Sequence, residues 1–301
     1  MLKSNLSKII SAVVLLAISV LAFLPLQAGQ GDRSEWMADL EDERSINRLF
    51  IPGTHDSGAT HSIADLSGKC QSLSIAEQLK IGVRFFDIRL QLKNNELVIV
   101  HSFVDQATDL DDVLSIMVDF LEEHPSEFLI VSFKEDNDPV GSDVDFTEAL
   151  EEMLKAESSV SKATGLPTTV GEARGRLHVI SRYRDSSIGL PAYEGWRDST
   201  SFELGGMYVQ DHYQVSDAET KIADVEDAME IASVLKHSLV LNFTSCYYPD
   251  GFPPTYAGTP ALRINPWLID RLNGGEAFGC VFVCDFMTDE LCDAVVGRNF
   301  E

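Results

Sequence analysis

The sequence predicts a single-domain α/β fold, an irregular (β/α)8 barrel of the TIM type, with a doubly wound open sheet as the alternative. Two observations predict it. Short apolar and β-branched runs alternate with helical patterns along the chain, and no repeat, low-complexity stretch or long linker divides it. The expected strands are Arg48–Pro52, Arg84–Gln91, Leu97–Ser102, Phe128–Glu135, Leu177–Arg182, Gly206–Asp211, Ser238–Ser245 and Phe278–Phe286. The expected helices are Thr108–Glu123, Asp145–Ala156, Ala218–His237 and Asn265–Asn273.

Polar side chains lie at or just beyond the carboxyl end of most of these strands. Packing of an apolar barrel core does not explain so many polar residues at the same end, and this end is where barrel active sites lie. The sequence therefore predicts one pocket that contains all of them. They are His55, Asp56, Asp87, Arg89, His101, Lys134, Arg182, Asp211, Tyr213 and Asp285.

The second and third strands are too close in sequence for a parallel crossover, so they are expected to form a hairpin. A two-residue turn at Asn94 and Asn95 would set His101 opposite Ile88, on the wrong face of the strand pair. A three-residue loop would set it opposite Asp87 or Arg89. We therefore expect an odd-numbered loop or a bulge, and an irregular barrel at this point.

The N-terminus has the pattern of an export signal. Two lysines precede the apolar run Ile9–Leu24, and Ala28 offers a small residue for cleavage. We predict a signal peptide over residues 1–28 and a secreted catalytic barrel over residues 29–301. An uncleaved membrane anchor is the alternative, although the run is shorter than the ~20 residues that a span needs.

The charge of the chain is strongly negative. It has 23 Lys and Arg against 48 Asp and Glu, a formal net charge of −25, with no basic cluster. A nucleic-acid partner is therefore not expected, and anionic lipid would repel the surface.

Five cysteines follow the predicted signal, and none forms a CxxC pair. A structural zinc site is therefore not supported. The odd number leaves at least one thiol free in an exported protein. Most of these cysteines are expected to be small buried hydrophobic residues. They are Cys70, Cys246, Cys280, Cys284 and Cys292.

Two histidines, an arginine and several carboxylates in one pocket suit displacement at phosphorus. One histidine removes a proton from the attacking hydroxyl, and the other protonates the leaving oxygen. The arginine neutralises charge on the non-bridging oxygens. The sequence contains no G-x-S-x-G, Walker, G-x-G-x-x-G or H-E-x-x-H motif.

The segments that carry these residues resemble the bacterial phosphatidylinositol-specific phospholipase C family, of the X-domain type. The likeness runs in order from about Trp36 to the C-terminus. Its blocks are Ile51–Gly58, Phe85–Arg89 with His101, Pro125–Lys134, Arg174–Arg182, Val209–Tyr213, Leu241–Ser245 and Gly279–Phe286. The resemblance implies an irregular (β/α)8 barrel that cleaves phosphatidylinositol to diacylglycerol and inositol 1,2-cyclic phosphate. It implies no cofactor, peripheral contact with membranes and a monomer. Glycosyl-phosphatidylinositol anchors are a further candidate substrate.

Each role is carried over from the resemblance by position. His55 matches the general base, and Asp285 matches the carboxylate that orients it. His101 matches the general acid, and Asp56 the carboxylate that works with it. Arg89 matches the arginine that stabilises the phosphate. Asp87 matches a supporting carboxylate, and the matches to the headgroup pocket are Lys134, Arg182, Asp211 and Tyr213.

The same comparison bears on metals and membranes. Calcium-using relatives have a carboxylate where this chain has Arg89, so we expect no metal in the reaction. The segment His61–Ser74, where relatives carry an exposed aromatic residue, has none. The loop Cys246–Tyr256 is rich in aromatic residues and follows the seventh predicted strand, so it is the candidate membrane contact.

Two other functions stay open. A glycerophosphodiester phosphodiesterase shares the barrel and two histidines, but it needs a His-Arg-Gly opening and a metal-binding acidic set. This chain has His55-Asp56-Ser57 instead. A non-catalytic inositide-binding module is the second alternative, but binding alone does not need a matched acid and base.

Overall fold

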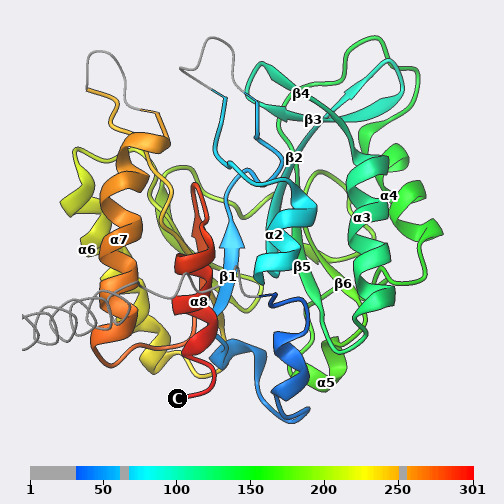
Figure 1. Cartoon of the computed structure of the whole chain (residues 1–301). Coiled ribbons are helices and arrows are strands. Elements are labelled where there is room, and N and C mark those ends of the chain that lie inside the picture. Colours follow the sequence, from blue (N-terminus) through cyan, green and yellow to red (C-terminus); the bar gives the residue numbers. More distant parts are fainter. Residues whose placement is uncertain (1–31, 62–67, 251–255) are drawn as a thin grey trace, which may run out of the picture. The chain divides into compact units, whose positions relative to one another are not determined.

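The computed structural model describes residues 32–61, 68–250 and 256–301. One sheet forms the core, with helices packed around it (Figure 1). Its strands follow the order β7-β6-β5-β2-β1-β11-β10-β9-β8. The strands of this path are β1 (Ile51–Thr54), β2 (Phe85–Lys93), β5 (Leu129–Glu135), β6 (Leu177–Arg182), β7 (Leu190–Pro191), β8 (Thr200–Leu204), β9 (Met207–Asp211), β10 (Leu239–Phe243) and β11 (Val281–Cys284). The predicted signal segment lies outside the described residues.

Along this path every neighbouring pair from β7 to β9 is parallel, and β8 runs antiparallel to β9. Helices cover this sheet, as expected for parallel strands that must bury both faces. The curled, mostly parallel sheet confirms the predicted irregular α/β barrel. No hydrogen-bonded pairing among the described residues joins β6 or β7 to β8 or β9, so the barrel is open between these strands.

The hairpin between β2 and β3 (Glu96–His101) corrects one prediction. Lys93 pairs with Glu96, so the turn at Asn94 and Asn95 has two residues, both with the positive φ that such a turn requires. The expected odd-numbered loop is wrong. The β2–β3 ladder ends at the Leu90–Ile99 pair, so it does not set the position of His101.

The third predicted strand is also not a barrel strand. Beyond Ile99, β3 pairs only with β4 (Val104–Asp109), and the register of that pairing shifts between Val98 and Val100. The bulge therefore exists, but in the β3–β4 ladder. The short β7, which the sequence did not predict, is the eighth parallel strand of the described sheet.

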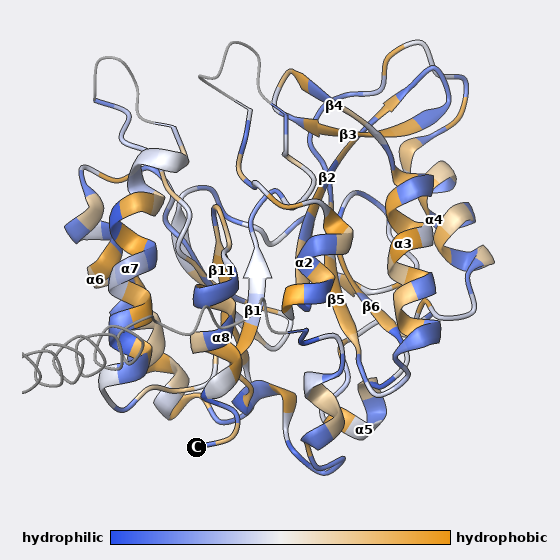
Figure 2. Cartoon of the chain, in the orientation of Figure 1, coloured by the Kyte–Doolittle hydropathy of each residue, from blue (hydrophilic) through white to orange (hydrophobic). Residues whose placement is uncertain are grey.

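Helices enclose the strands, and Figure 2 shows apolar and polar residues alternating along α3 and α4 beside the apolar β5 and β6. The structure confirms the four predicted helices with changed ends and adds α2, α5 and α8. Their bounds are α2 (Ile75–Ile81), α3 (Leu110–Glu123), α4 (Phe146–Ala156), α5 (Val170–Ala173), α6 (Ala218–Val234), α7 (Gly258–Gly274) and α8 (Asp289–Gly297), with short 3₁₀ turns at Trp36–Asp39 and Ile46–Arg48. None of the described helices is long and apolar enough to cross a bilayer.

Close packing at β1 brings the first strand end into the centre of the sheet. All four residues of β1 are buried, and a Cβ on Gly53 would lie 3.0 Å from the Cβ of Phe85 and 3.2 Å from the carbonyl oxygen of Phe282. Only glycine allows the neighbouring strands to approach so closely. This packing sets the position of His55, the residue that follows β1.

A buried ion pair stabilises the opposite end of the barrel. The Arg84 guanidinium and the Glu127 carboxylate are both fully buried, and their closest atoms are 2.8 Å apart. Arg84 also donates to the backbone carbonyls of Arg33, Ser34 and Leu79. This arginine therefore joins the N-terminal segment to the barrel, away from the predicted site.

All five cysteines are free and buried, as the sequence predicted for most of them. Cys280, Cys284 and Cys292 belong to the apolar interior, whereas Cys70 and Cys246 border the cavity described next.

Candidate active site

A cavity of about 900 Å³ opens at the carboxyl ends of the parallel strands. The structure brings all ten predicted residues together there. Two of them, Asp56 and Asp87, are completely buried and lie against Arg89. The other eight line the cavity: His55, Arg89, His101, Lys134, Arg182, Asp211, Tyr213 and Asp285.

Strand register places three cations in a row across the cavity. Arg89 on β2 is level with Lys134 on β5, which is level with Arg182 on β6. Residues that are level on adjacent parallel strands point to the same face. Three positive groups therefore face the interior side by side, and they form a site for an anion such as a phosphodiester.

One carboxylate balances this row. Asp87 precedes Arg89 by two residues, so it points to the same face, and it lies 3.1 Å from Arg89 and 3.3 Å from Arg182. Burial alone would raise the pKa of Asp87, but Arg89 and Arg182 outweigh it and hold this pKa well below its usual range. Asp87 is therefore a permanent anion that holds the two guanidinium groups in place.

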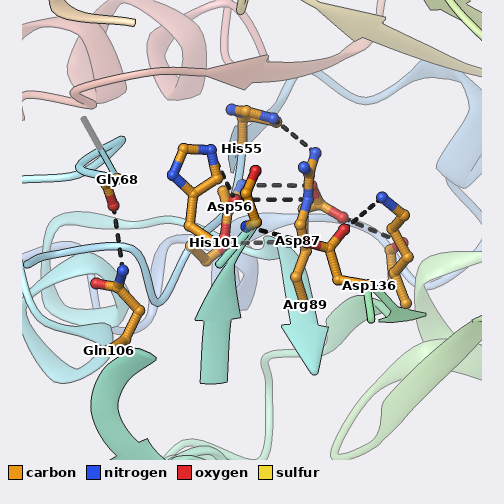
Figure 3. A network of polar contacts seen from close by, with 12 residues as sticks. His55, Asp56, Gly68, Asp87, Arg89, His101, Gln106 and Asp136 are labelled. Atoms are coloured by element: carbon orange, nitrogen blue, oxygen red, sulfur yellow. Dashed lines mark hydrogen bonds and ion pairs between the residues drawn. The ribbon is translucent and has the colours of Figure 1, made fainter. Parts of the chain in front are cut away.

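His55 has one nitrogen on a carboxylate and the other on a guanidinium. Its Nδ1 is 2.8 Å from Asp285. Its Nε2 is 2.7 Å from Nη2 of Arg89, the contact that Figure 3 shows. Arginine only donates, so Nε2 is the acceptor and Nδ1 carries the proton toward Asp285. Burial opposes protonation of the ring, but Asp285 acts against it, and the pKa of His55 is raised. This is the environment of a base.

His101 and Asp56 form a second acid–base pair. Nε2 of His101 is 3.7 Å from Asp56, and neither Asp56 oxygen accepts a hydrogen bond from any described residue. Burial raises the pKa of Asp56 to about 7. Burial, followed by the charges of Arg89 and His55, lowers the pKa of His101 to about 4. Near neutral pH Asp56 is therefore protonated in about half of the molecules and His101 in very few, so the carboxyl group is the better place for a proton.

Trp196 was not predicted, and it lies where the sheet is open. The Arg182 guanidinium stacks 3.7 Å above its ring, and its indole nitrogen donates to Asp211 at 3.2 Å. The ring thus connects β6 to β9 in place of backbone hydrogen bonds. Trp196 lies outside every strand and in no motif, so the sequence offered no signal for it.

Asp136 and Cys70 also line the cavity without having been predicted. Asp136 bonds to Lys134 and accepts from the backbone of Ser102 at 3.1 Å. It follows the end of β5 directly, so the strand-end pattern could have found it. Cys70 lies outside the strands and carries no sequence signal of this kind.

Two groups of described residues have donor atoms close enough to hold a metal ion. They are His55, Cys70 and Asp285, and Asp56, Cys70 and His101; within each group the donor atoms lie within 4.8 Å of one another. Both contain Cys70, which is a soft ligand unsuited to calcium.

Comparison with known proteins agrees with this geometry. Residues 44–180 match the family model "Phosphatidylinositol-specific phospholipase C, X domain". The chain is 26% identical over 276 residues to a 1-phosphatidylinositol phosphodiesterase of Staphylococcus aureus, covering 82% of this chain and 86% of that protein. It is 23% identical over 274 residues to the protein of the same name from Listeria monocytogenes, covering 88% and 84%.

Solved structures show the same fold. An S. aureus phosphatidylinositol-specific phospholipase C, whose structure concerns the modulation of membrane binding, matches with a TM-score of 0.75 at 24% identity, covering 87% of this chain and 97% of that one. The Listeria monocytogenes phosphatidylinositol-specific phospholipase C matches with a TM-score of 0.73 at 20% identity, covering 89% and 99%.

Proposed function

Because the chain is a relative of the bacterial phosphatidylinositol-specific phospholipases C, with their X domain at residues 44–180, we propose that it cleaves phosphatidylinositol. The products are diacylglycerol and inositol 1,2-cyclic phosphate. One observation carries the proposal: two histidines, each with its own carboxylate, share one cavity with an arginine that contacts His55 directly and lies beside the carboxylate of His101. Such a matched base, acid and anion-binding group is what in-line displacement at phosphorus needs.

His55 is the general base of the proposed reaction. Its proton on Nδ1 is held by Asp285, which leaves Nε2 to take a proton from the inositol 2-hydroxyl. Arg89 occupies Nε2 in the structure without substrate. A phosphodiester binds a guanidinium more strongly than a neutral imidazole does, because both partners are charged. Substrate binding therefore draws Arg89 onto the phosphate and frees Nε2 for the hydroxyl.

The acid is the Asp56–His101 pair. Nε2 of His101, which lies 3.7 Å from Asp56, takes up the proton of the pair and gives it to the diacylglycerol oxygen as the phosphorus–oxygen bond breaks. The approaching phosphate anion favours the protonated imidazole, since a nearby opposite charge stabilises the charged form. Buried Asp56 thus supplies a proton that His101 alone would not hold at neutral pH.

The rest of the cavity suits a polyol. Lys134 and Arg182 donate to hydroxyl or phosphate oxygens, and Asp211 accepts from hydroxyls. The Tyr213 ring offers a face for the sugar. The 2-hydroxyl is held close to phosphorus within the same molecule, so its attack is strongly favoured over attack by water. The first product is therefore the cyclic phosphodiester.

Exposed aromatic residues at the cavity rim support contact with a membrane. Phe103 and Tyr256 both line the cavity and are 84% and 40% exposed. Phe252, which belongs to the aromatic loop predicted to contact lipid, lies outside the described residues. Because the chain has a net charge of −25, its attachment to anionic bilayers depends on apolar contact.

We expect Phe103→Ser to lower activity on phosphatidylinositol vesicles more than on a soluble inositol phosphodiester. Phe300 is also exposed but does not line the cavity, so Phe300→Ser is the control and should lower neither activity. An equal loss on both substrates would contradict the membrane role of Phe103.

The signal pattern at residues 1–28 supports export with cleavage after Ala28, so the proposed enzyme is secreted. In this proposal it is a monomer that binds membranes peripherally and transiently.

The test is phosphorus NMR of phosphatidylinositol turnover at early times. We expect a five-membered cyclic phosphate before any acyclic monophosphate, and none in His55→Ala. If the monophosphate appears first, the chemistry is direct hydrolysis, as in a glycerophosphodiester phosphodiesterase. If wild type binds inositol phosphates without turnover, the domain is a binding module.

A further inference from the structure

The acid pair has a third close neighbour that the proposed reaction does not use, the thiol of Cys70. Its sulfur, a carboxylate oxygen of Asp56 and a ring nitrogen of His101 lie within 4.8 Å of one another. Cys70 is 1% exposed and borders the cavity. The three side chains come from three different segments, so their meeting is a property of the fold.

The backbone that carries Cys70 is firmly held. Its N–H donates to the Ala59 carbonyl at 2.8 Å, and its own carbonyl accepts from Phe286 at 2.7 Å. Two residues earlier, the Gly68 carbonyl accepts from Gln106 of β4 at 3.2 Å (Figure 3). The sulfur therefore stays beside the acid pair.

The donors in this cluster have lone pairs that no hydrogen bond uses. Asp56 is completely buried, and neither of its oxygens accepts a hydrogen bond from the described residues. Arg89 lies 3.6 Å from Asp56 as an ion pair, which leaves both oxygens free to accept. Nδ1 of His101 is likewise buried, with no hydrogen-bond partner among the described residues. Buried polar atoms without partners are uncommon, because leaving such an atom unpaired costs about 1–3 kcal/mol. An ion that these atoms can bind would remove that cost.

We propose that Asp56, Cys70 and His101 form an inhibitory binding site for a thiophilic divalent cation, Zn²⁺ or Cd²⁺. Sulfur, imidazole nitrogen and carboxylate oxygen are the three ligand types of zinc, and three protein ligands with one open position is a common arrangement. Zinc bonds of about 2.0–2.3 Å put neighbouring ligand atoms about 3–4 Å apart. The cluster closes onto the ion with side-chain movements of about 1 Å.

Charge permits the ion despite the neighbouring arginine. The other three carboxylates around the cavity, Asp87, Asp136 and Asp285, equal in number the cations Arg89, Lys134 and Arg182, so the negative charge that the ion meets must come from its own ligands. Loss of the thiol proton and of any proton on Asp56 makes the ligand set doubly negative, which matches a divalent cation. A thiolate also selects zinc and cadmium over calcium and magnesium, which prefer oxygen.

Binding there stops the proposed reaction, because the ion takes the lone pairs and the proton site of the acid pair. The inhibition, but not the binding, rests on the proposed function. The site differs from a calcium site of catalysis, since it contains a thiol, excludes hard cations and lowers turnover.

Binding is tested by titrating the full chain with CdCl₂ and following the ultraviolet absorption of the thiolate-to-cadmium charge transfer. We expect one equivalent to produce the band in wild type and in Cys292→Ser, a control that removes a buried thiol outside the cluster. Cys70→Ser is expected to lose the band. Asp56→Asn keeps the thiol but removes a carboxylate ligand. We expect this variant to bind cadmium at least about tenfold more weakly, because even residues that only hydrogen-bond to a metal ligand change metal affinity by about 10–100-fold.

Inhibition is tested by the ZnCl₂ concentration that halves turnover, with each variant normalised to its own metal-free rate. We expect EDTA to reverse the inhibition, Ca²⁺ not to cause it, and Cys70→Ser to need at least about tenfold more zinc. A cadmium band that survives Cys70→Ser, or an Asp56→Asn affinity equal to wild type, would overturn the site. The same holds if wild type gives no band. A chain that binds cadmium as described but cleaves no phosphatidylinositol would overturn only the proposed function.

Discussion

Replacing Asp56 by asparagine tests how the acid side of the reaction works. The side chain is completely buried and its pKa of about 7 makes it the proton store of the pair with His101. Asparagine has nearly the same shape but cannot hold the proton. His101 must then hold the proton alone, with its pKa of about 4.

The size of the effect follows from that pKa. Burial, Arg89 and His55 lower it, and the substitution removes none of these causes. At pH 7 the protonated fraction of His101 is then on the order of 10⁻³, and at pH 5 about one tenth. We expect kcat/KM of Asp56→Asn to fall about 10³-fold at pH 7 and only about tenfold at pH 5. The alkaline limb of the pH profile therefore moves to lower pH.

The assay compares two inositol phosphodiesters, one with an alkoxide leaving group and one with an acidic phenol. A good leaving group needs no proton, so Asp56→Asn and His101→Ala should recover most of their loss with the phenol. His55→Ala is the control, because loss of the base is not rescued by a better leaving group. An Asp56→Asn deficit that is the same at both pH values and with both leaving groups would refute the proton-store role.

Three further predictions follow from other contacts. Asp285→Asn should lower kcat/KM at least about 100-fold and move the acid limb to lower pH, because the imidazolium of His55 loses the carboxylate that raises its pKa; an unmoved limb would contradict that contact. Arg84→Ala should lower the free energy of unfolding in urea by about 3–5 kcal/mol, since it leaves Glu127 buried and unpaired, whereas removal of the exposed Arg263 should cost at most about 1 kcal/mol. Arg89→Ala should cost about 3–4 kcal/mol of transition-state stabilisation, and wild-type activity should survive excess EDTA; loss of activity with EDTA and recovery with calcium would show that a metal shares the work of Arg89.

The sequence by itself determined most of the site, because parallel strands share one carboxyl end. Once the apolar runs were recognised as strands of one sheet, the polar residues at their ends had to meet. The row of Arg89, Lys134 and Arg182 is the clearest case, since each is found from its own strand and register aligns the three. Asp136 obeys the same rule and could have been added.

Tertiary structure decided what lies between those strand ends. A two-residue turn predicted His101 on the wrong face, yet it reaches Asp56 because β3 leaves β2 after Ile99 and follows β4 instead. The periodicity of apolar residues does not show where the hydrogen-bond ladder between two strands ends. That end depends on which partner strand offers more hydrogen bonds and more burial.

Residues outside the strands show the same limit. Trp196 connects Arg182 to Asp211 where the barrel is open, and Cys70 lies beside the acid pair from a segment with no strand pattern. Their neighbours are distant in sequence, so only the folded chain brings them together. Strand periodicity reports which way a side chain points, and long-range packing alone decides what it meets there.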